Sequence, residues 1–278
     1  MTSGVLLLSV ALAAPLTVTA PVNVTVTEHV LTTEHVGTQH VVVISPSDAS
    51  PTRGYPGLVA YAGLGEARRG NKAGAWGWVE KYGLLPAIEA MQRGRLSVED
   101  AQGLLNAKRL AAWNKELKAA PYSGLIIVCP FPSKKTSHHD WVVETLLPWA
   151  EETVHVTPGR WGVDGISLGG GVSSVVGFAH PEAFMSIGSL QGAVTQGRRT
   201  AVERSIARWQ GDWSARSIQI ITSRGDGFRP ALTDFHRWLD RRRIVHRFEV
   251  LPGRHNKAFV KGPGVLRMLM FHNQALRR

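Results

Sequence analysis

The chain has 278 residues, of which 44% are hydrophobic, and its formal net charge at pH 7 is +11. This length and apolar content are enough for the core of one large domain, and they exclude a mostly disordered chain. The basic residues form scattered pairs and triplets, so we expect a soluble cationic surface and no nucleic-acid partner, with attraction to anionic polymers as the alternative. The single cysteine, Cys129, excludes an internal disulfide, and its apolar surroundings predict a buried thiol.

Residues 1–20 contain an apolar stretch, 5–16, that has two interpretations. Small residues at positions 14 and 20 fit the cleavage site of a signal peptide, and the protein is then exported. No Lys or Arg precedes the stretch and a proline follows each cleavage point, which favours an extra N-terminal strand in a cytoplasmic protein. Both interpretations stay open, with export preferred. The stretch is short for a membrane span, so we expect no stable membrane insertion.

The first half of the chain combines β-branched segments with helix-forming ones. Strands are expected at residues 25–30, 39–44 and 58–61, the first two as an antiparallel pair. A proline-rich loop separates the second strand from the third, which enters a glycine turn at 63–65. Helices are expected at 82–91 and, as one broken helix or two, at 98–118, where Ser97 and Asp100 resemble a capping box.

From residue 124 onward, strands and helices alternate regularly. Strands are expected at 124–129, 161–165, 183–189, 217–222 and 245–251, and helices at 141–153, 170–179, 230–242 and 264–275. This alternation predicts an α/β fold with a mostly parallel sheet and helices on both faces, in a single domain spanning 21–278. The arginine-rich segment 195–215 is a candidate lid insertion, whose Trp209 and Trp213 would line a substrate cleft.

The segment Gly165-Ile166-Ser167-Leu168-Gly169 matches the pattern G-x-S-x-G, between a predicted strand and a predicted helix. A sharp strand-to-helix turn forces its central residue into a strained conformation, and small neighbours relieve the crowding. The Ser167 hydroxyl would then project above the sheet, at a helix N-terminus where negative charge is stabilised. The alternative, a Gly/Ser turn without chemistry, is disfavoured by the strand and the helix on either side.

A serine nucleophile needs a base, and the base needs a carboxylate, in the chain order Ser, Asp or Glu, His. Asp226 follows a predicted strand after a short glycine-containing turn, whereas the competing carboxylates lie in a predicted helix or in the arginine-rich segment: Asp212, Asp234 and Asp240. His255 lies in the loop after the last strand. The competing histidines lie in predicted helices, at the wrong end of that strand or too near the nucleophile helix: His180, His236, His246 and His272. We therefore expect Ser167, His255 and Asp226 to form a catalytic triad.

The oxyanion of an acyl-transfer reaction needs N–H donors. We expect them to be the backbone N–H groups of Leu168, just after the serine, and of Leu64, in the glycine turn after an earlier strand. The run His138-His139-Asp140 has metal-ligand residue types, but adjacent residues rarely bind one ion together, so a loop or helix-cap role is expected and no metal.

At these residues the chain resembles the esterase group of the α/β-hydrolase superfamily that includes esterase D-like, feruloyl-esterase-like and enterochelin-esterase-like proteins. The similar pieces are the turn at 63–65, the elbow at 165–169, Asp226 with Phe228, and the segment 252–256. Two positions depart from the pattern of many relatives: Ala62 replaces a histidine before the oxyanion loop, and Arg254 replaces a glycine before the catalytic histidine. The resemblance implies an α/β-hydrolase fold and a serine esterase without cofactor.

The expected function is hydrolysis of a small-molecule or polymer-linked carboxylic ester through an acyl-enzyme. A peptidase or an acyltransferase would use the same triad, and a catalytically idle binding protein could keep the same scaffold.

Overall fold

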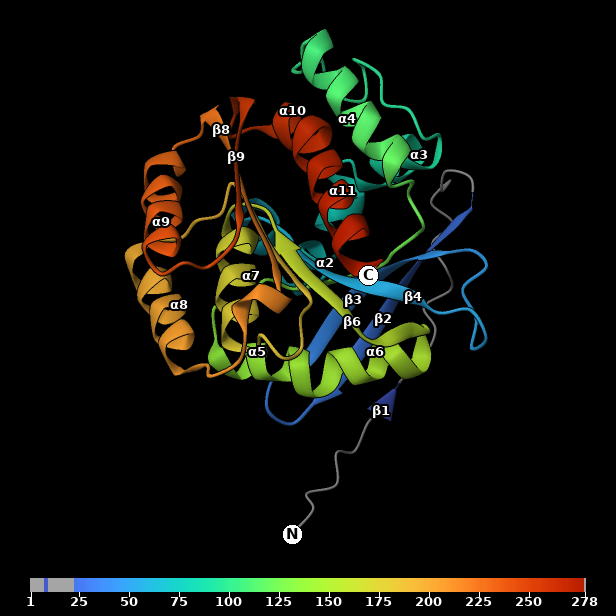
Figure 1. Cartoon of the computed structure of the whole chain (residues 1–278). Helices are drawn as coiled ribbons and strands as arrows, with labels where there is room; N and C mark the ends of the chain where they lie inside the picture. The colour runs from blue at the N-terminus through green and yellow to red at the C-terminus, as the bar shows by residue number, and fades with distance from the viewer. Residues whose placement is uncertain (1–7, 10–22, 278) are drawn as a thin grey trace.

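A nine-stranded sheet forms the centre of the computed structural model, which describes residues 8–9 and 23–277 (Figure 1). The strand order is β1-β2-β3-β5-β4-β6-β7-β8-β9. The strands are β1 (Leu8–Ser9), β2 (Val24–Thr33), β3 (Gly37–Pro46), β4 (Tyr55–Tyr61), β5 (Ile126–Pro130), β6 (Val156–Gly165), β7 (Ser186–Leu190), β8 (Ser217–Gly225) and β9 (Arg247–Arg254). The pairs from β1 to β3 and the β3–β5 pair are antiparallel, and all later pairs are parallel. The predicted mostly parallel sheet with antiparallel N-terminal strands is confirmed.

Helices cover both faces of the sheet, as predicted (Figure 1). One face carries α2 (Asn71–Glu80), α3 (Leu84–Gln92), α4 (Ala107–Ala119) and α11 (Val265–Leu276). The other face carries α5 (Thr136–Trp141), α6 (Leu147–Thr153), α7 (Leu168–Ala179), α8 (Gln196–Arg208) and α9 (Arg229–Arg241). Shorter elements are α1 (Leu64–Ala67), α10 (Lys257–Phe259), the π-helical turns η1 (Val142–Leu146) and η3 (Val260–Gly264), and the 3₁₀ turn η2 (Trp213–Ala215).

The two cores are supplied by alternate residues of the same strands. In β3, Val42 and Ile44 belong to one core, while Val41 and Val43 belong to the other, and all four are fully buried. Side chains alternate across a strand, so a strand covered on both faces must be apolar throughout. This explains why the central strands read as continuous hydrophobic runs, and it also buries Cys129. Burial raises the pKa of the Cys129 thiol, which therefore stays protonated and unreactive.

Several elements differ from those expected from the sequence. The helix expected from residue 98 begins only at Ala107, although Ser97 and Asp100 do exchange the two hydrogen bonds of a capping box, at 2.8 and 3.1 Å. That box organises a turn instead of a helix. The whole of α2 was not expected, because its two glycines and near-uniform burial remove the amphipathic pattern on which a helix prediction depends.

Segment 195–215 consists mainly of α8, the helix that connects the parallel strands β7 and β8. Val202 and Ile206 of α8 are buried in the core beside α7. Trp213 packs against Phe178 near the C-terminal end of α7, with ring centroids 5.3 Å apart, and against Trp209 at 4.5 Å. This end of α7 is remote from Ser167, and the lid role of the segment stays a prediction.

The N-terminal segment is described only in part. Leu8 pairs with Thr32 of β2, which makes residues 8–9 a short antiparallel strand. The rest of the segment interpreted as a signal peptide or extra strand, residues 1–7 and 10–20, lies outside the described residues. Among the helices of the described part, none combines the length and the apolar character that crossing a bilayer requires.

Asp164, His272 and Ser186 form a buried polar cluster at the end of β6, the strand that leads to Ser167. Asp164 of β6 lies 3.0 Å from Nε2 of His272 on α11, and Nδ1 of the same ring lies 2.7 Å from the Ser186 hydroxyl. The side chains of Asp164 and His272 are 1% and 0% exposed. The second oxygen of Asp164 accepts the N–H of Gly165 at 2.6 Å. Each polar group of the cluster thus has a partner, as burial requires.

Breaking this buried pair should destabilise the protein strongly. His272→Leu puts an apolar side chain in place of the imidazole and leaves the Asp164 carboxylate without its partner on this ring. We therefore expect a loss of about 3–5 kcal/mol in the free energy of unfolding. Urea denaturation at pH 7 measures it. The control is His180→Leu, because His180 makes only looser contacts near the surface, at 3.5 Å to Asp140 and 3.6 Å to Glu182, and should change stability by about 1 kcal/mol or less. Equal effects of the two variants would contradict the prediction.

Candidate active site

Four consecutive parallel strands, β6 to β9, end at the same edge of the sheet. Each is followed by a polar residue: Ser167 two positions after β6, Gln191 directly after β7, Asp226 after β8 and His255 after β9. The carboxyl ends of parallel strands are where open α/β sheets build their sites. Sequence elements up to 88 residues apart therefore converge on one edge.

Ser167 lies in the sharp turn that was expected between a strand and a helix. Its backbone angles are φ 57° and ψ −112°, which a non-glycine residue rarely adopts. Glycine is required two residues before the serine and two residues after it, at Gly165 and Gly169. A Cβ on Gly169 would lie 2.3 Å from the Tyr61 carbonyl oxygen, and a Cβ on Gly165 would lie 2.5 Å from the backbone of Gly169. The G-x-S-x-G spacing thus follows from contacts between main-chain atoms.

Hydrogen bonds hold this strained turn in place. The N–H of Ser167 donates to the Leu190 carbonyl at 3.0 Å, and the Ser167 carbonyl accepts the N–H of Ala193 at 2.8 Å. Two residues after the serine, the N–H of Gly169 donates to the Ile166 carbonyl at 2.8 Å. Strained backbone persists only where its surroundings fix it, and such positions cluster at functional sites. Ser167 itself is only partly buried, unlike the residues on either side of it.

His255 and Asp226 form a hydrogen-bonded pair, with 2.9 Å between His255 Nδ1 and Asp226 Oδ1. The same oxygen accepts the N–H of Phe228 at 3.0 Å, and Oδ2 accepts the Thr222 hydroxyl at 2.7 Å. Burial alone would raise the pKa of Asp226, but hydrogen bonds from His255, Phe228 and Thr222 outweigh it and lower the pKa. Asp226 is therefore an ionised acceptor, which fixes the proton of His255 on Nδ1 and leaves Nε2 free to act as a base.

The exposure of the two side chains differs sharply. The Asp226 carboxylate is fully buried, whereas the His255 ring is 32% exposed, and the Phe228 ring lies against it with centroids 5.5 Å apart. A buried carboxylate that orients a partly accessible imidazole is the arrangement of a general base and its orienting group.

Gln191 joins the serine side of the site to the histidine side, and sequence reasoning missed it. It follows Leu190, the acceptor of the Ser167 N–H, and its side-chain nitrogen donates to the Ser223 hydroxyl at 2.7 Å and to the Arg254 carbonyl at 3.2 Å. The residue is fully buried, with φ at 45°. The available signal was its position two residues after a predicted strand, 183–189, between the strands that carry the nucleophile and the acid.

The two expected oxyanion donors are both first residues of helices. Leu168 opens α7 and Leu64 opens α1, so neither N–H has a partner within its own helix. The loop before Leu64 is anchored because the Gly63 N–H donates to the Tyr82 hydroxyl at 3.1 Å. That hydroxyl in turn donates to the Glu66 carboxylate.

The competing carboxylates and histidines lie away from this edge. Asp212 caps the η2 turn through Ser214, and Asp234 pairs with Arg237 on the surface of α9. His272 belongs to the buried cluster with Asp164. Within the run predicted to be a loop or helix cap, His138 and His139 are instead buried in α5, and His139 bonds the Ser133 carbonyl at 3.1 Å. His236, Asp240 and His246 form a separate cluster, described below.

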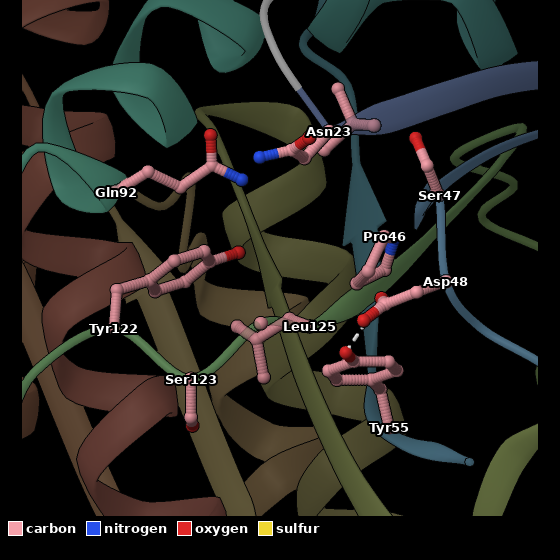
Figure 2. A pocket seen from close by; sticks show the side chains of 11 residues that line it. Asn23, Pro46, Ser47, Asp48, Tyr55, Gln92, Tyr122, Ser123 and Leu125 are labelled. Carbon is pink, nitrogen blue, oxygen red and sulfur yellow. Dashed lines mark hydrogen bonds between the residues drawn. The ribbon is translucent and has the colours of Figure 1, made fainter.

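Two cavities of the described structure are lined by other residues. One, of about 450 Å³, opens where strands begin, opposite the serine edge, and Tyr55 bonds Asp48 within it at 2.7 Å (Figure 2). The other, of about 690 Å³, lies between α5, α7 and α8 and is lined by Val172, Arg198 and Arg204 among others. The residues that line these two cavities do not include Ser167, Asp226 or His255, so neither is the candidate active site.

Comparison with known proteins gives matches in structure. No protein-family model and no curated protein sequence matches the chain. A ferulic acid esterase superposes with a TM-score of 0.68 at 15% identity, over 91% of this chain and 99% of that chain. S-formylglutathione hydrolase FrmB from Staphylococcus aureus superposes with a TM-score of 0.60 at 12% identity, over 90% and 96% of the two chains. Enterobactin hydrolase IroE gives 0.53 at 14% identity, over 92% and 97%. These proteins represent the three groups that the sequence resembles, so the resemblance is confirmed at the level of the fold, and the chain has the α/β-hydrolase fold.

Proposed function

We propose that this protein is a serine hydrolase that cleaves a carboxylic ester through an acyl-enzyme, with Ser167 as nucleophile, His255 as base and Asp226 as orienting carboxylate. The observation that carries the proposal is the strained, partly buried Ser167 on the edge of the sheet where the hydrogen-bonded pair of His255 and Asp226 also lies. The names of the compared structures, an esterase and two hydrolases, support the same reaction class.

The reaction begins when His255 Nε2 removes the hydroxyl proton as Ser167 Oγ attacks the ester carbonyl. The imidazolium that forms is stabilised by the ionised Asp226, whose lowered pKa keeps its charge throughout. His255 then gives the proton to the departing alcohol, and an acyl-Ser167 intermediate remains. Water, deprotonated by the same histidine, attacks this intermediate and releases the acid and free Ser167.

The negative charge of each tetrahedral intermediate develops on the former carbonyl oxygen. We infer that the N–H of Leu168 and the N–H of Leu64 donate to this oxygen. Fixed N–H groups that meet developing charge lower the barrier because they need no reorganisation during the reaction. The anchoring of Gly63 by Tyr82 would keep the Leu64 donor in place.

The experiment that tests the proposal is hydrolysis of p-nitrophenyl esters of increasing acyl length, combined with a fluorophosphonate probe and mapping of the adduct by mass spectrometry. We expect turnover, and a phosphonylated peptide that contains Ser167. The acyl-length preference would report the depth of the acyl pocket. A folded protein with no adduct at Ser167 and no turnover would overturn the proposal in favour of an idle scaffold. An adduct with ester products formed only on addition of an alcohol acceptor would identify an acyltransferase instead.

A further inference from the structure

Two histidines and an aspartate meet where α9 connects to β9, at the end of the sheet opposite Ser167. His236 and Asp240 are one turn apart on α9, so their side chains share a face of the helix. His246 directly precedes β9. One ligand atom from each of the three residues lies within 4.8 Å of the other two. From the sequence, His236 and Asp240 were expected on a helix and His246 at the start of a strand, without a role in catalysis.

His246 is oriented as metal-binding histidines are. Its Nδ1 lies 2.8 Å from the Ile244 carbonyl, an acceptor, so Nδ1 carries the ring proton and donates it. Its Nε2 therefore presents a lone pair, and this atom lies 2.8 Å from His236 Nδ1 and 3.9 Å from Asp240 Oδ1. The side chain is 1% exposed. A metal-ligating histidine commonly donates its other N–H to a backbone carbonyl in this way, which fixes the tautomer.

The His236 ring cannot satisfy both of its neighbours with one proton. Its Nδ1 faces the lone pair of His246 Nε2 at 2.8 Å, and its Nε2 faces Asp240 Oδ2 at 3.4 Å. A neutral ring has a single N–H. A proton on Nδ1 leaves the Nε2 lone pair against a carboxylate, and a proton on Nε2 leaves two nitrogen lone pairs facing each other. No neutral tautomer of His236 satisfies both contacts, whereas a cation held by these atoms would.

We propose that His236, Asp240 and His246 bind one first-row divalent metal ion, with zinc as the best fit. Two imidazoles and one carboxylate suit zinc, whereas magnesium and calcium prefer oxygen ligands. The Asp240 side chain is 57% exposed, which leaves room for water as a fourth ligand. The ion would connect the end of α9 to the start of β9. Its role is structural, and it does not rest on the proposed esterase activity, whose chemistry is at the other end of the sheet.

The surroundings of the cluster favour this assignment. The His236 ring stacks on Phe248 of β9, with centroids 4.4 Å apart and an angle of 9° between the planes, which limits its rotation. Two nearby arginines have partners of their own: Arg237 pairs with Asp234 at 3.5 Å, and Arg242, just after the helix, lies over the Trp238 ring at 4.3 Å.

Calorimetric titration of zinc into tag-free full-length protein, freed of metal with EDTA, tests the site. We expect one equivalent to bind to the wild type. His236→Gln and Asp240→Asn each remove a ligand, from side chains that are 30% and 57% exposed, and should weaken the binding by at least about 10–100-fold, the loss that removing a hydrogen-bond partner of a ligand already causes. Asp234→Asn is the matched control, since it removes a carboxylate from the same helix outside the cluster, and its affinity for zinc should equal that of the wild type.

A second readout is the thermal midpoint, which a ligand raises when it binds only the folded state. Zinc should raise the midpoint of the wild type and of Asp234→Asn but not that of His236→Gln, and magnesium should raise none of them. Zinc bound with equal affinity and stoichiometry by the wild type and His236→Gln, or not bound by the wild type, would overturn the proposal. Zinc binding without ester hydrolysis, or hydrolysis without zinc binding, would separate the failure of one proposal from the failure of the other.

Discussion

Replacing Ser167 by alanine should lower kcat for an activated ester by about 10⁴–10⁶-fold, because the acyl-enzyme can no longer form. Only the catalysis supplied by the oxyanion donors and by substrate binding would remain. The strained angles at residue 167 are set by main-chain contacts, so the alanine variant should keep the fold. Steady-state hydrolysis of a p-nitrophenyl ester and circular dichroism measure the two expectations.

The matched control for this substitution is Ser174→Ala. Ser174 lies on the same helix, but its hydroxyl donates at 2.8 Å to the Gly170 carbonyl and is buried. Its loss should leave kcat within a few-fold of the wild type. Ester turnover that survives in Ser167→Ala at the level of this control would exclude Ser167 as the nucleophile.

Removing the carboxylate of Asp226 should have the second largest effect on catalysis. Asp226→Ala leaves His255 without the acceptor that orients it and without the charge that stabilises the imidazolium, and we expect kcat to fall by about 10⁴-fold. For Asp226→Asn, kcat should fall by a similar factor, because the amide keeps the position beside Phe228 and His255 but carries no charge to stabilise the imidazolium or to fix the tautomer. An alanine variant within 10-fold of the wild type would contradict the assigned role.

Asp226 also links stability to pH in a direction that its surroundings determine. Its pKa is lowered in the folded state, so its ionised form stabilises the fold above the unfolded value of about 3.8, and this contribution is lost as the pH falls below it. Asn does not titrate. The stability of the wild type relative to Asp226→Asn should therefore fall as the pH drops below about 4, as urea denaturation at several pH values would measure.

The arrangement of the site was predictable because it depends on strand ends. Ser167, Asp226 and His255 each follow a short segment predicted to be a strand, and the alternation of such segments with helical ones can be recognised from the sequence. Parallel strands separated by helices must end at one edge, so residues after them converge without any knowledge of side-chain packing. The hydrogen bond between His255 and Asp226 agrees with this prediction, whereas the participation of Ser167 in the same unit stays a prediction.

Elements defined by packing were not predictable. The helix α2 is buried through Gly74 and Trp78 on more than one side, so it has no polar stripe to mark it. The helix α8 is rich in arginine and buries only Val202 and Ile206, so its sequence lacks the broad apolar stripe that indicates a helix. Gln191 gains its role from contacts with Ser223 and Arg254, far along the chain, and no local pattern encodes such contacts.

The buried cluster beneath the elbow has a consequence for recognising enzymes from geometry. Asp164, His272 and Ser186 line up a carboxylate, an imidazole and a hydroxyl at 3.0 and 2.7 Å, the same chemical series as a catalytic triad. All three residues are sealed from solvent, so no substrate can reach that hydroxyl. A search for a carboxylate, an imidazole and a hydroxyl at these distances would therefore also match this buried cluster, although it has no access to substrate. Solvent access and the strained backbone of the serine, more than the identity of its partners, distinguish a working hydroxyl from a structural one.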